Sequence, residues 1–589
     1  MRRGSDGWTP VSWRRGAVVL GLLGVIAIAG HRVERARPIA FVGGQVMTMD
    51  GESRVVEALL VRRGRIDALG TREAILARRP FGTRVIELDG ATLLPGFIDA
   101  HGHFPVSGLA VASVDLAPPP LGEVGDVATL LARIGDAAEE APGEGWLLGF
   151  NYDNTALADG RHPTRDALDR VSGGHPVYLR HGSGHMGVAN SRALAALGIE
   201  EADVAVVGGV LGRDAAGRLD GLLQERSAPS LARLLRDLPL HTLPKILFHA
   251  RDEYLAAGMT TVQSGGANAR LAAALRWSAR LGLLPHRVVI WPLHAAHGAS
   301  ARTPSTPSTP STANDDGIRR ARIGSDPSVV EGPLKLLADG SPQGLTAWLS
   351  RPYDAAAGLP AGDAGFPAMP VETLHAHIAH HHAAGQRLAI HANGDAAIEA
   401  IIDGVARAQL AHPRDDPRHV LVHAQTIRRD QLARLGALGL TPSFFVGHTF
   451  YWGDWHRQRG LGAERARTIS PTGWARELGV RYTLHADTPV TPMDPMQLLW
   501  SATERLTASG YLLGPEQRVS RLDALRALTI DAAWQSELEA VLGSLEVGKL
   551  ADLVVLSGDP LSAPDVRELH VTGAWIGGIE RYRRAGAGS

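Results

Sequence analysis

The chain has 589 residues and a formal net charge of −1, with 44 % hydrophobic and 21 % charged residues. This length can hold a barrel of roughly 250 residues or more together with a second module, and the balanced charge gives no reason to expect a nucleic acid as a partner. The absence of cysteine excludes disulfides, iron–sulfur clusters, thiolate zinc sites and a cysteine nucleophile.

Residues 1–30 have the pattern of an export signal. Arginine pairs precede an apolar run from Gly16 to Gly30, which is short for a membrane-spanning helix. Ala27 and Ala29 provide an A-x-A cleavage pattern. We therefore expect a signal peptide or an uncleaved membrane anchor, and an exported or membrane-anchored protein.

The two ends of the remaining chain share alternating, glycine-punctuated strand patterns. They cover residues 39–95 and residues 543–580. Neither set could form a sizeable sheet alone. We expect the two segments to build one small composite β-sandwich domain.

Between them, short apolar strands alternate with helix-length stretches rich in Ala, Leu and Arg, which favours parallel βα units. The eight strand candidates are "GFIDAH", "MTTVQS", "RVVIWP", "PLKLLAD", "RLAIHA", "HVLVHA", "TPSFFV" and "VRYTLHAD". Eight such strands predict an α/β fold, a distorted (β/α)8 TIM barrel over residues 96–542. An inserted subdomain at about 105–257 and a low-complexity flexible loop at 300–317 interrupt it.

An H-x-H pair follows the first of these strands. Alternate residues of an extended segment point to the same side, so His101 and His103 can face one metal ion. A competing cluster stands in "LHAHIAHHHAAG", where His377 and His381 lie one helical turn apart and could also bind a metal. Because this helix runs into the strand ending at His391, we interpret its histidines as a solvated helix surface at the opposite face of the barrel.

Polar residues interrupt or close four of the other strands. Lys335 lies within the fourth strand, His391 and His423 end the fifth and sixth, and Asp487 ends the eighth. Strand ends at the C-terminal face of a barrel converge, so these residues and the H-x-H pair could share one site. The chain has only three lysines, so the lysine at 335 stands out against the arginine-rich composition.

These motifs resemble the amidohydrolase superfamily, and within it the YtcJ-like (amidohydrolase 3) branch of metal-dependent hydrolases, including enzymes of the N-substituted formamide deformylase type. The resemblance runs from about residue 39 to 575. It rests on the segments "LLPGFIDAHGH", "PVYLRHGSGHMGVANSRAL", "LKLLADGSPQG", "AIHANGDAA", "HTFYWGD", "HADTPVTPMDP" and "GSLEVGKLADLVVL".

The resemblance implies a binuclear centre with two divalent ions, for which zinc suits the ligand types. His101 and His103 would hold one ion together with Asp487, and His391 and His423 the other. A carboxylated Lys335 would bridge them. A metal-bridging hydroxide would attack the substrate carbonyl, and Asp487 would transfer the proton to the departing nitrogen as the catalytic acid/base.

Several loop residues are candidates for substrate contacts: His185, Gln343, His448, Tyr451 and Trp452. The Trp/Tyr pair suggests an apolar or aromatic group on a small-molecule, amide-type substrate. We expect Asn393 and Asp395 to cap the helix after the fifth strand instead of contacting substrate.

Hydrolysis of an amide-type C–N bond, as in an N-acyl or N-formyl amine, is the first hypothesis for the function. The alternatives are a mononuclear metal-dependent deaminase, against which Lys335 argues, a cyclic-amide hydrolase, and an exported metal-binding protein without catalysis. An oligomer is compatible with all three.

Overall fold

The computed structural model describes residues 37–141, 143, 145–235, 238–294 and 326–586. The expected export signal (1–30) and flexible loop (300–317) therefore lie outside the described residues. Within the described part of the chain, no helix has both the length and the hydropathy needed to cross a bilayer.

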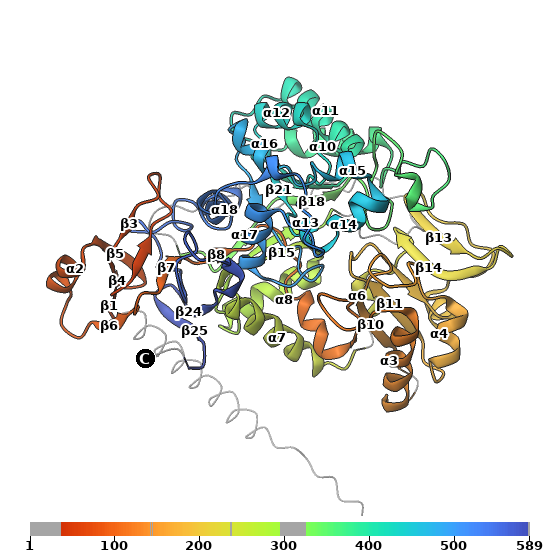
Figure 1. Cartoon of the computed structure of the whole chain (residues 1–589), viewed down its shortest axis with the longest axis horizontal. Helices are drawn as coiled ribbons and strands as arrows, with labels where there is room; N and C mark the ends of the chain where they lie inside the picture. Colours follow the sequence, from red (N-terminus) through yellow and green to blue (C-terminus); the bar gives the residue numbers. More distant parts are fainter. Residues whose placement is uncertain (1–36, 142, 144, 236–237, 295–325, 587–589) are drawn as a thin grey trace, which may run out of the picture.

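Strands from both chain ends build two sheets beside one another (Figure 1). The four-stranded sheet contains only N-terminal strands, in the order β5 (Arg65–Gly70), β4 (Ala58–Arg62), β1 (Ile39–Val42) and β6 (Arg84–Glu87). The six-stranded sheet combines both ends, in the order β25 (Ile579–Arg583), β24 (Val571–Ile576), β23 (Leu553–Leu556), β7 (Thr92–Pro95), β2 (Gln45–Met47) and β3 (Val55–Val56). Phe41 of the first sheet packs edge-on against Trp575 of the second, with ring centroids 5.0 Å apart, so the two segments share a core.

All eight predicted central strands are present, and this prediction is confirmed. They fall into two parallel sheets, one ordered β17-β16-β15-β8 and the other β18-β19-β20-β21-β22. The strands are β8 (Phe97–Ile98), β15 (Met259–Ala267), β16 (Arg287–Pro292), the additional β17 (Val329–Glu331), β18 (Leu334–Leu337), β19 (Leu388–Ala392), β20 (Val420–His423), β21 (Thr441–Phe444) and β22 (Thr483–Leu484).

Backbone contacts join the edges of these two sheets on both sides. At one junction, Leu293 pairs in parallel with Lys335. At the other, the Asp487 N–H donates to the His101 carbonyl at 3.2 Å, and the His103 N–H donates to the carbonyl of Thr488 at 2.9 Å. The C-terminal ends of strands from both sheets therefore lie next to one another.

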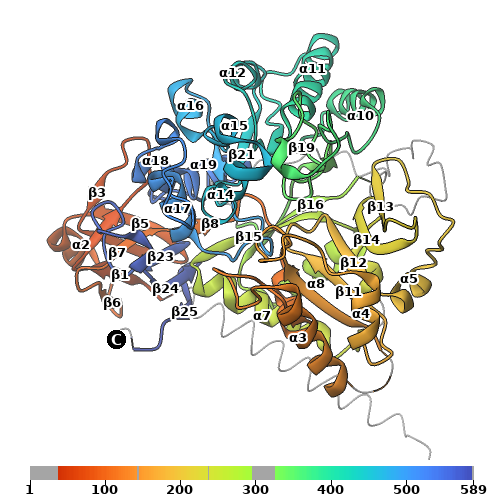
Figure 2. The same cartoon turned by 45° about the vertical axis from the view of Figure 1, so that its right-hand side comes forward.

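Helices alternate with the central strands and lie outside them (Figure 2). Their amphipathic spacing explains this position. In α11, for example, Ile398, Ile401, Ile402 and Val405 recur at helical intervals and are fully buried. The principal helices are α7 (Thr242–Ala256), α8 (Ala269–Arg280), α10 (Val371–Ala383), α11 (Asp395–Ala411), α12 (Arg429–Ala437), α16 (Thr472–Glu477), α17 (Pro495–Glu504), α18 (Arg521–Ala527) and α19 (Ile530–Gln535).

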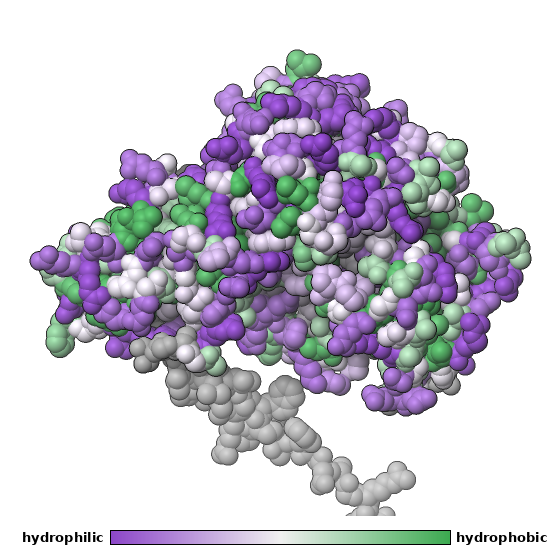
Figure 3. Space-filling view, viewed as in Figure 1, coloured by the Kyte–Doolittle hydropathy of each residue, from purple (hydrophilic) through white to green (hydrophobic). Residues whose placement is uncertain are grey.

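A further sheet lies between β8 and β15 in the sequence and has its own hydrophobic cores. Its order is β13 (Gly209–Arg213), β14 (Leu219–Glu225), β12 (Met186–Ala189), β11 (Val177–His181), β10 (Leu147–Tyr152) and β9 (Val114–Asp115), with helices α3 (Val127–Glu140), α4 (Arg165–Val171), α5 (Ser191–Leu197) and α6 (Leu231–Leu234). On the face of the molecule that Figure 3 shows, polar and apolar residues are interspersed over the described part of the chain.

A buried ion pair connects the central strands to the composite sheet. The guanidinium of Arg287, in β16, donates from Nε to Asp552 Oδ2 at 2.6 Å and from Nη2 to Oδ1 at 2.9 Å. Both side chains are 3 % exposed. A bidentate pair in this position holds two segments in one fixed orientation.

Candidate active site

The H-x-H pair lies directly after β8, and its first histidine is rigidly oriented. His101 is fully buried, and its Nδ1–H donates to Gln263 Oε1 at 2.9 Å, which leaves Nε2 as the nitrogen with a free lone pair. The His101 ring also stacks on Trp291, with centroids 5.2 Å apart. Gln263 and Trp291 come from the neighbouring strands β15 and β16, so the packing of parallel strands fixes the direction of this imidazole.

Asp487 lies between the two histidines of this pair. Its Oδ1 is 3.3 Å from His101 Nε2 and 3.2 Å from His103 Nε2. Burial raises the pKa of Asp487, but His103, His485 and Lys335 together outweigh burial and hold that pKa below its ordinary value. Asp487 has φ 54°, a strained backbone that persists only where the surroundings impose it.

Two further histidines face each other beside this carboxylate. His423 Nε2 lies 3.0 Å from His391 Nδ1 and 4.0 Å from Asp487 Oδ2. The His391 Nε2–H donates to the Gly340 carbonyl at 3.1 Å, which leaves Nδ1 for another partner. The other nitrogen of His423 contacts His485 Nε2 at 3.1 Å. Like Asp487, His423 has a positive φ, 73°.

Lys335 reaches the same cluster from β18. Its Nζ lies 3.1 Å from His101 Nε2, and the residue is 3 % exposed. Burial lowers the pKa of the Lys335 amine to about 7. The neutral amine is the form that can react with carbon dioxide, and at this pKa a large fraction of Lys335 is neutral near pH 7.

The six residues predicted to share a site are thus together, and their donor atoms fit metal ions. Two ligand atoms on one tetrahedral zinc ion lie about 3.3 Å apart, because each is about 2.0–2.1 Å from the metal. The separations of Asp487 Oδ1 from the two His101 and His103 nitrogens match this value. Although it is buried among these nitrogens, Asp487 Oδ1 has no hydrogen-bond partner among the described residues. One ligand atom each of His101, His423 and Asp487 lies within 4.8 Å of the others.

A pocket opens beside His391, His423 and Asp487. Three of the five predicted substrate contacts line it, namely His185, Gln343 and His448, together with Ser183, Ser341, Asn393, Phe445 and Val490. Tyr451 and Trp452 are not among the described residues that line it. The indole N–H of Trp452 instead donates to Asp153 Oδ2 at 2.6 Å, which ties this loop to the inserted sheet.

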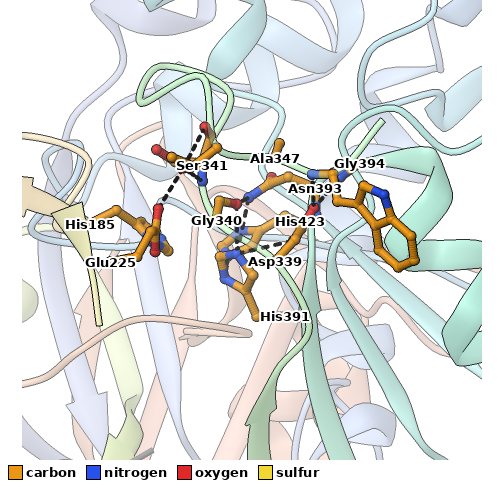
Figure 4. A network of polar contacts seen from close by, with 12 residues as sticks. His185, Glu225, Asp339, Gly340, Ser341, Ala347, His391, Asn393, Gly394 and His423 are labelled. Carbon is orange, nitrogen blue, oxygen red and sulfur yellow. Dashed lines mark hydrogen bonds and ion pairs between the residues drawn. The ribbon is translucent and has the colours of Figure 1, made fainter. Parts of the chain in front are cut away.

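A polar network supports the pocket wall (Figure 4). His185 Nδ1 contacts Glu225 Oε2 at 2.8 Å, and the Thr346 hydroxyl donates to the other oxygen of Glu225. The carboxylate of Asp339 accepts from the backbone N–H groups of Asn393 and Gly394, at 3.0 and 2.7 Å. These bonds hold the turn that follows His391.

The prediction that Asn393 and Asp395 cap a helix is wrong. Helix α11 begins at Asp395 with Gly394 as its N-cap, and the structure has no side-chain cap bond there. Asn393 instead donates from Nδ2 to the Gly340 carbonyl at 2.8 Å and lines the pocket. The carboxylate of Asp395 instead accepts hydrogen bonds from the Ser350 N–H and the Arg428 guanidinium.

The interpretation of the α10 histidines as a solvated surface is also wrong. Only His380 is exposed, whereas His375, His377 and His381 are half-buried and His382 is buried. Helix α10 packs against α11 and the neighbouring strand β19, and its buried residues are Leu374, Ile378 and His382.

Four residues of the site were not found from the sequence: Gln263, Asp339, Glu225 and His485. Gln263 lies 162 positions from His101 and Glu225 lies 40 positions from His185, and no local spacing reveals such pairs. His485 had a usable signal, because it lies two positions before Asp487 in the same extended segment and so shares its face of the strand.

A buried set of imidazoles, a carboxylate and a lysine at the C-terminal ends of parallel strands is the arrangement of a metal-dependent hydrolase. The sequence signature of the Amidohydrolase family matches residues 84–582, and the chain belongs to this family.

The chain is 29 % identical over 558 residues to the N-substituted formamide deformylase of Arthrobacter pascens, which covers 94 % of this chain and 99 % of that protein. It is 28 % identical over 541 residues to the "Putative amidohydrolase YtcJ" of Bacillus subtilis, covering 90 % of this chain and 96 % of that protein. An uncharacterised metal-dependent hydrolase of Pyrococcus horikoshii has a similar structure, with a TM-score of 0.68 and 23 % identity, covering 90 % of this chain and 100 % of that one.

Proposed function

We propose that the protein hydrolyses an amide-type C–N bond, such as that of an N-acyl or N-formyl amine, at a centre of two divalent metal ions. The observation that carries the proposal is the position of Asp487. Its carboxylate lies 3.2–3.3 Å from two imidazole nitrogens and borders a pocket with polar groups on its other walls. Similarity to an N-substituted formamide deformylase supports the choice of a C–N bond.

His101 and His103 would hold one ion together with Asp487, His391 and His423 would hold the second, and carboxylated Lys335 would bridge them. Zinc suits this set of nitrogen and oxygen donors. When bound, the two ions lower the pKa of a water molecule and polarise the substrate carbonyl.

The chain's own residues supply the remaining steps. Asp487, whose Oδ1 lies 3.2 Å from His103 Nε2, accepts the proton of the attacking water and delivers it to the departing nitrogen, which leaves as an amine. His185, Gln343 and His448 line the pocket and offer hydrogen bonds to the polar part of the substrate, while Phe445 and Val490 contact its apolar part.

We further propose that the two parallel sheets are halves of one distorted (β/α)8 barrel over residues 96–542, interrupted by the subdomain at about 105–257. The backbone contacts at both junctions support closure. Residues 39–95 and 543–580 would then be the two parts of a β-sandwich domain. Residues 1–30 would be a signal peptide or anchor that places the enzyme outside the cytoplasm.

Lys335 provides the decisive test. Lys335→Ala should lose at least one metal ion per chain and at least about 100-fold in activity, because replacing even an outer partner of a ligand costs 10–100-fold. Lys335→Arg should also lose metal and activity, since the fixed positive charge of arginine repels both ions. Small carboxylic acids should partly restore Lys335→Ala by occupying the bridge.

Labelled bicarbonate gives a matched control. Wild-type protein should show one carbamate signal by ¹³C NMR, and Lys335→Ala should lose it. Lys245→Ala removes an exposed lysine and should keep both the signal and the activity. Two bound metals and full turnover in Lys335→Ala would refute the binuclear centre. Hydrolysis of the esters in a panel of N-formyl amines, N-acyl amines and esters, with no release of amine from the amides, would refute C–N specificity.

A further inference from the structure

Three half-buried histidines meet on the outer side of the central strands. His377 and His381 belong to helix α10 and lie one turn apart on one of its faces, and His294 follows the end of β16. The ring centroid of His294 is 4.3 Å from that of His377 and 5.2 Å from that of His381. One nitrogen from each of the three rings lies within 4.8 Å of the others.

His381 is oriented as metal-binding histidines usually are. Its Nδ1–H donates to Gln386 Oε1 at 2.6 Å, so Nε2 carries the lone pair. That Nε2 is buried and has no hydrogen-bond partner among the described residues. A ligating imidazole typically donates its second N–H to such an acceptor, which fixes both its tautomer and its direction. A buried nitrogen left without a partner costs free energy unless something occupies the position beside it.

The other histidines of α10 are engaged elsewhere or exposed. His375 Nε2–H donates to the Ala400 carbonyl at 2.8 Å. His382 contacts His419 at 2.9 Å through Nδ1 and the His412 carbonyl at 2.9 Å through Nε2. His380 is exposed. His377 and His381 are therefore the two histidines of α10 that lie against His294.

This cluster is separate from the candidate active site. The two sites contact Lys335 through different atoms. Leu293 pairs with the Lys335 backbone, and the His294 N–H donates to the Lys335 carbonyl at 3.0 Å. The side-chain amine of Lys335 instead lies beside His101, in the candidate active site. The ring contacts of His294 among the described residues are with the α10 histidines. An ion held here would fasten α10 to the end of β16, beside the strand that carries Lys335.

We propose that His294, His377 and His381 form an additional binding site for a divalent transition-metal ion that prefers imidazole ligands, such as Zn²⁺. Three imidazoles leave a fourth position open for water, which is a common zinc arrangement. The nitrogens need to close by small rotations to reach zinc–nitrogen distances of about 2.0–2.1 Å, and half-buried rings can make them. The ion would link helix α10 to the end of β16 on the outside of the strands.

The test counts zinc in the full chain, purified without a polyhistidine tag, stripped with a chelator and reloaded with zinc alone. The double variant His377→Ala/His381→Ala should bind one zinc ion per chain fewer than wild type, while its turnover with saturating active-site metal stays unchanged. His380→Ala is the matched control on the same helix and should bind as many ions as wild type.

A second measurement covers the case of a poorly folded double variant. His381→Gln keeps a polar side chain of similar size, and zinc should raise its thermal unfolding midpoint less than it raises that of wild type, since an ion that binds only the folded state stabilises it. Equal zinc content in wild type and both His381 variants, with equal thermal shifts, would overturn the proposal. Lys335→Ala separates the two centres, because it should lose active-site metal and keep this ion.

Discussion

Replacing Gln263 by leucine isolates the orientation of His101 from its chemistry. Gln263 is 1 % exposed, and its Oε1 accepts both from His101 Nδ1–H, at 2.9 Å, and from the Gly102 N–H, at 2.8 Å. Leucine has a similar size but no acceptor, so Gln263→Leu leaves two donors buried without partners.

Two consequences of different size follow. Each buried donor without a partner costs about 1–3 kcal/mol, so the free energy of unfolding should fall by about 2–6 kcal/mol. Loss of the partner of a ligating imidazole should weaken metal binding about 10–100-fold, or about 1.4–2.8 kcal/mol. Urea unfolding of the metal-free protein measures the first effect, and competition with a chromophoric chelator measures the second.

Gln535→Leu is the matched control. Gln263 and Gln535 both donate to the Ala100 carbonyl, at 3.2 and 2.7 Å, but the oxygen of Gln535 accepts from Thr483 and not from a candidate ligand. Gln535→Leu should therefore lower stability and leave metal affinity unchanged. Gln263→Glu keeps an acceptor for His101 and should retain most of the affinity. If Gln263→Leu and Gln535→Leu bind metal equally well, the reasoning fails.

Two further predictions concern stability away from the site. Asp552→Ala leaves Arg287 buried with half of its partners, so the unfolding free energy should fall by about 3–5 kcal/mol. Arg84→Ala breaks the partly exposed pair with Glu580 and should lower the unfolding free energy by at most about 1 kcal/mol. Equal losses of unfolding free energy for Asp552→Ala and Arg84→Ala in urea titrations would contradict this prediction. Burial raises the pKa of Asp531 to about 6, so the folded state binds this proton more tightly and loses stability as pH rises from about 4 to 6. The free energy of unfolding of Asp531→Asn should match that of wild type near pH 4 and exceed it by about 2–3 kcal/mol above pH 7. A difference in unfolding free energy that is constant with pH would exclude this contribution of Asp531.

The sequence was sufficient to predict the central strands, because each is an apolar run that ends at a polar residue or a turn. It was also sufficient to predict which polar residues gather. His391, His423 and Asp487 each end a separate strand, and ends of parallel strands meet. What it could not supply was the second partner of each side chain. Gln263 and Glu225 matter through contacts with residues far away in the sequence, which no local spacing encodes.

The histidine-rich helix α10 shows the same limit of prediction from sequence. Helical periodicity places His377 and His381 on one face, and that was visible in the sequence. The exposure of this face depends on what packs over it. His294 follows strand β16, far from α10 in the sequence, so the sequence alone could not distinguish a solvated surface from a half-buried cluster.

The composite sheet has a consequence for the order of folding during synthesis. Strand β7 ends at Pro95, but its antiparallel partner β23 begins at Leu553, so one edge of β7 has no partner until almost the whole chain has been made. Contacts of such long range form slowly, and an unpaired strand edge is a template for association with other chains. Chaperone dependence and aggregation of nascent protein should therefore be most sensitive to changes in the last strands, although they lie far from the metal ligands.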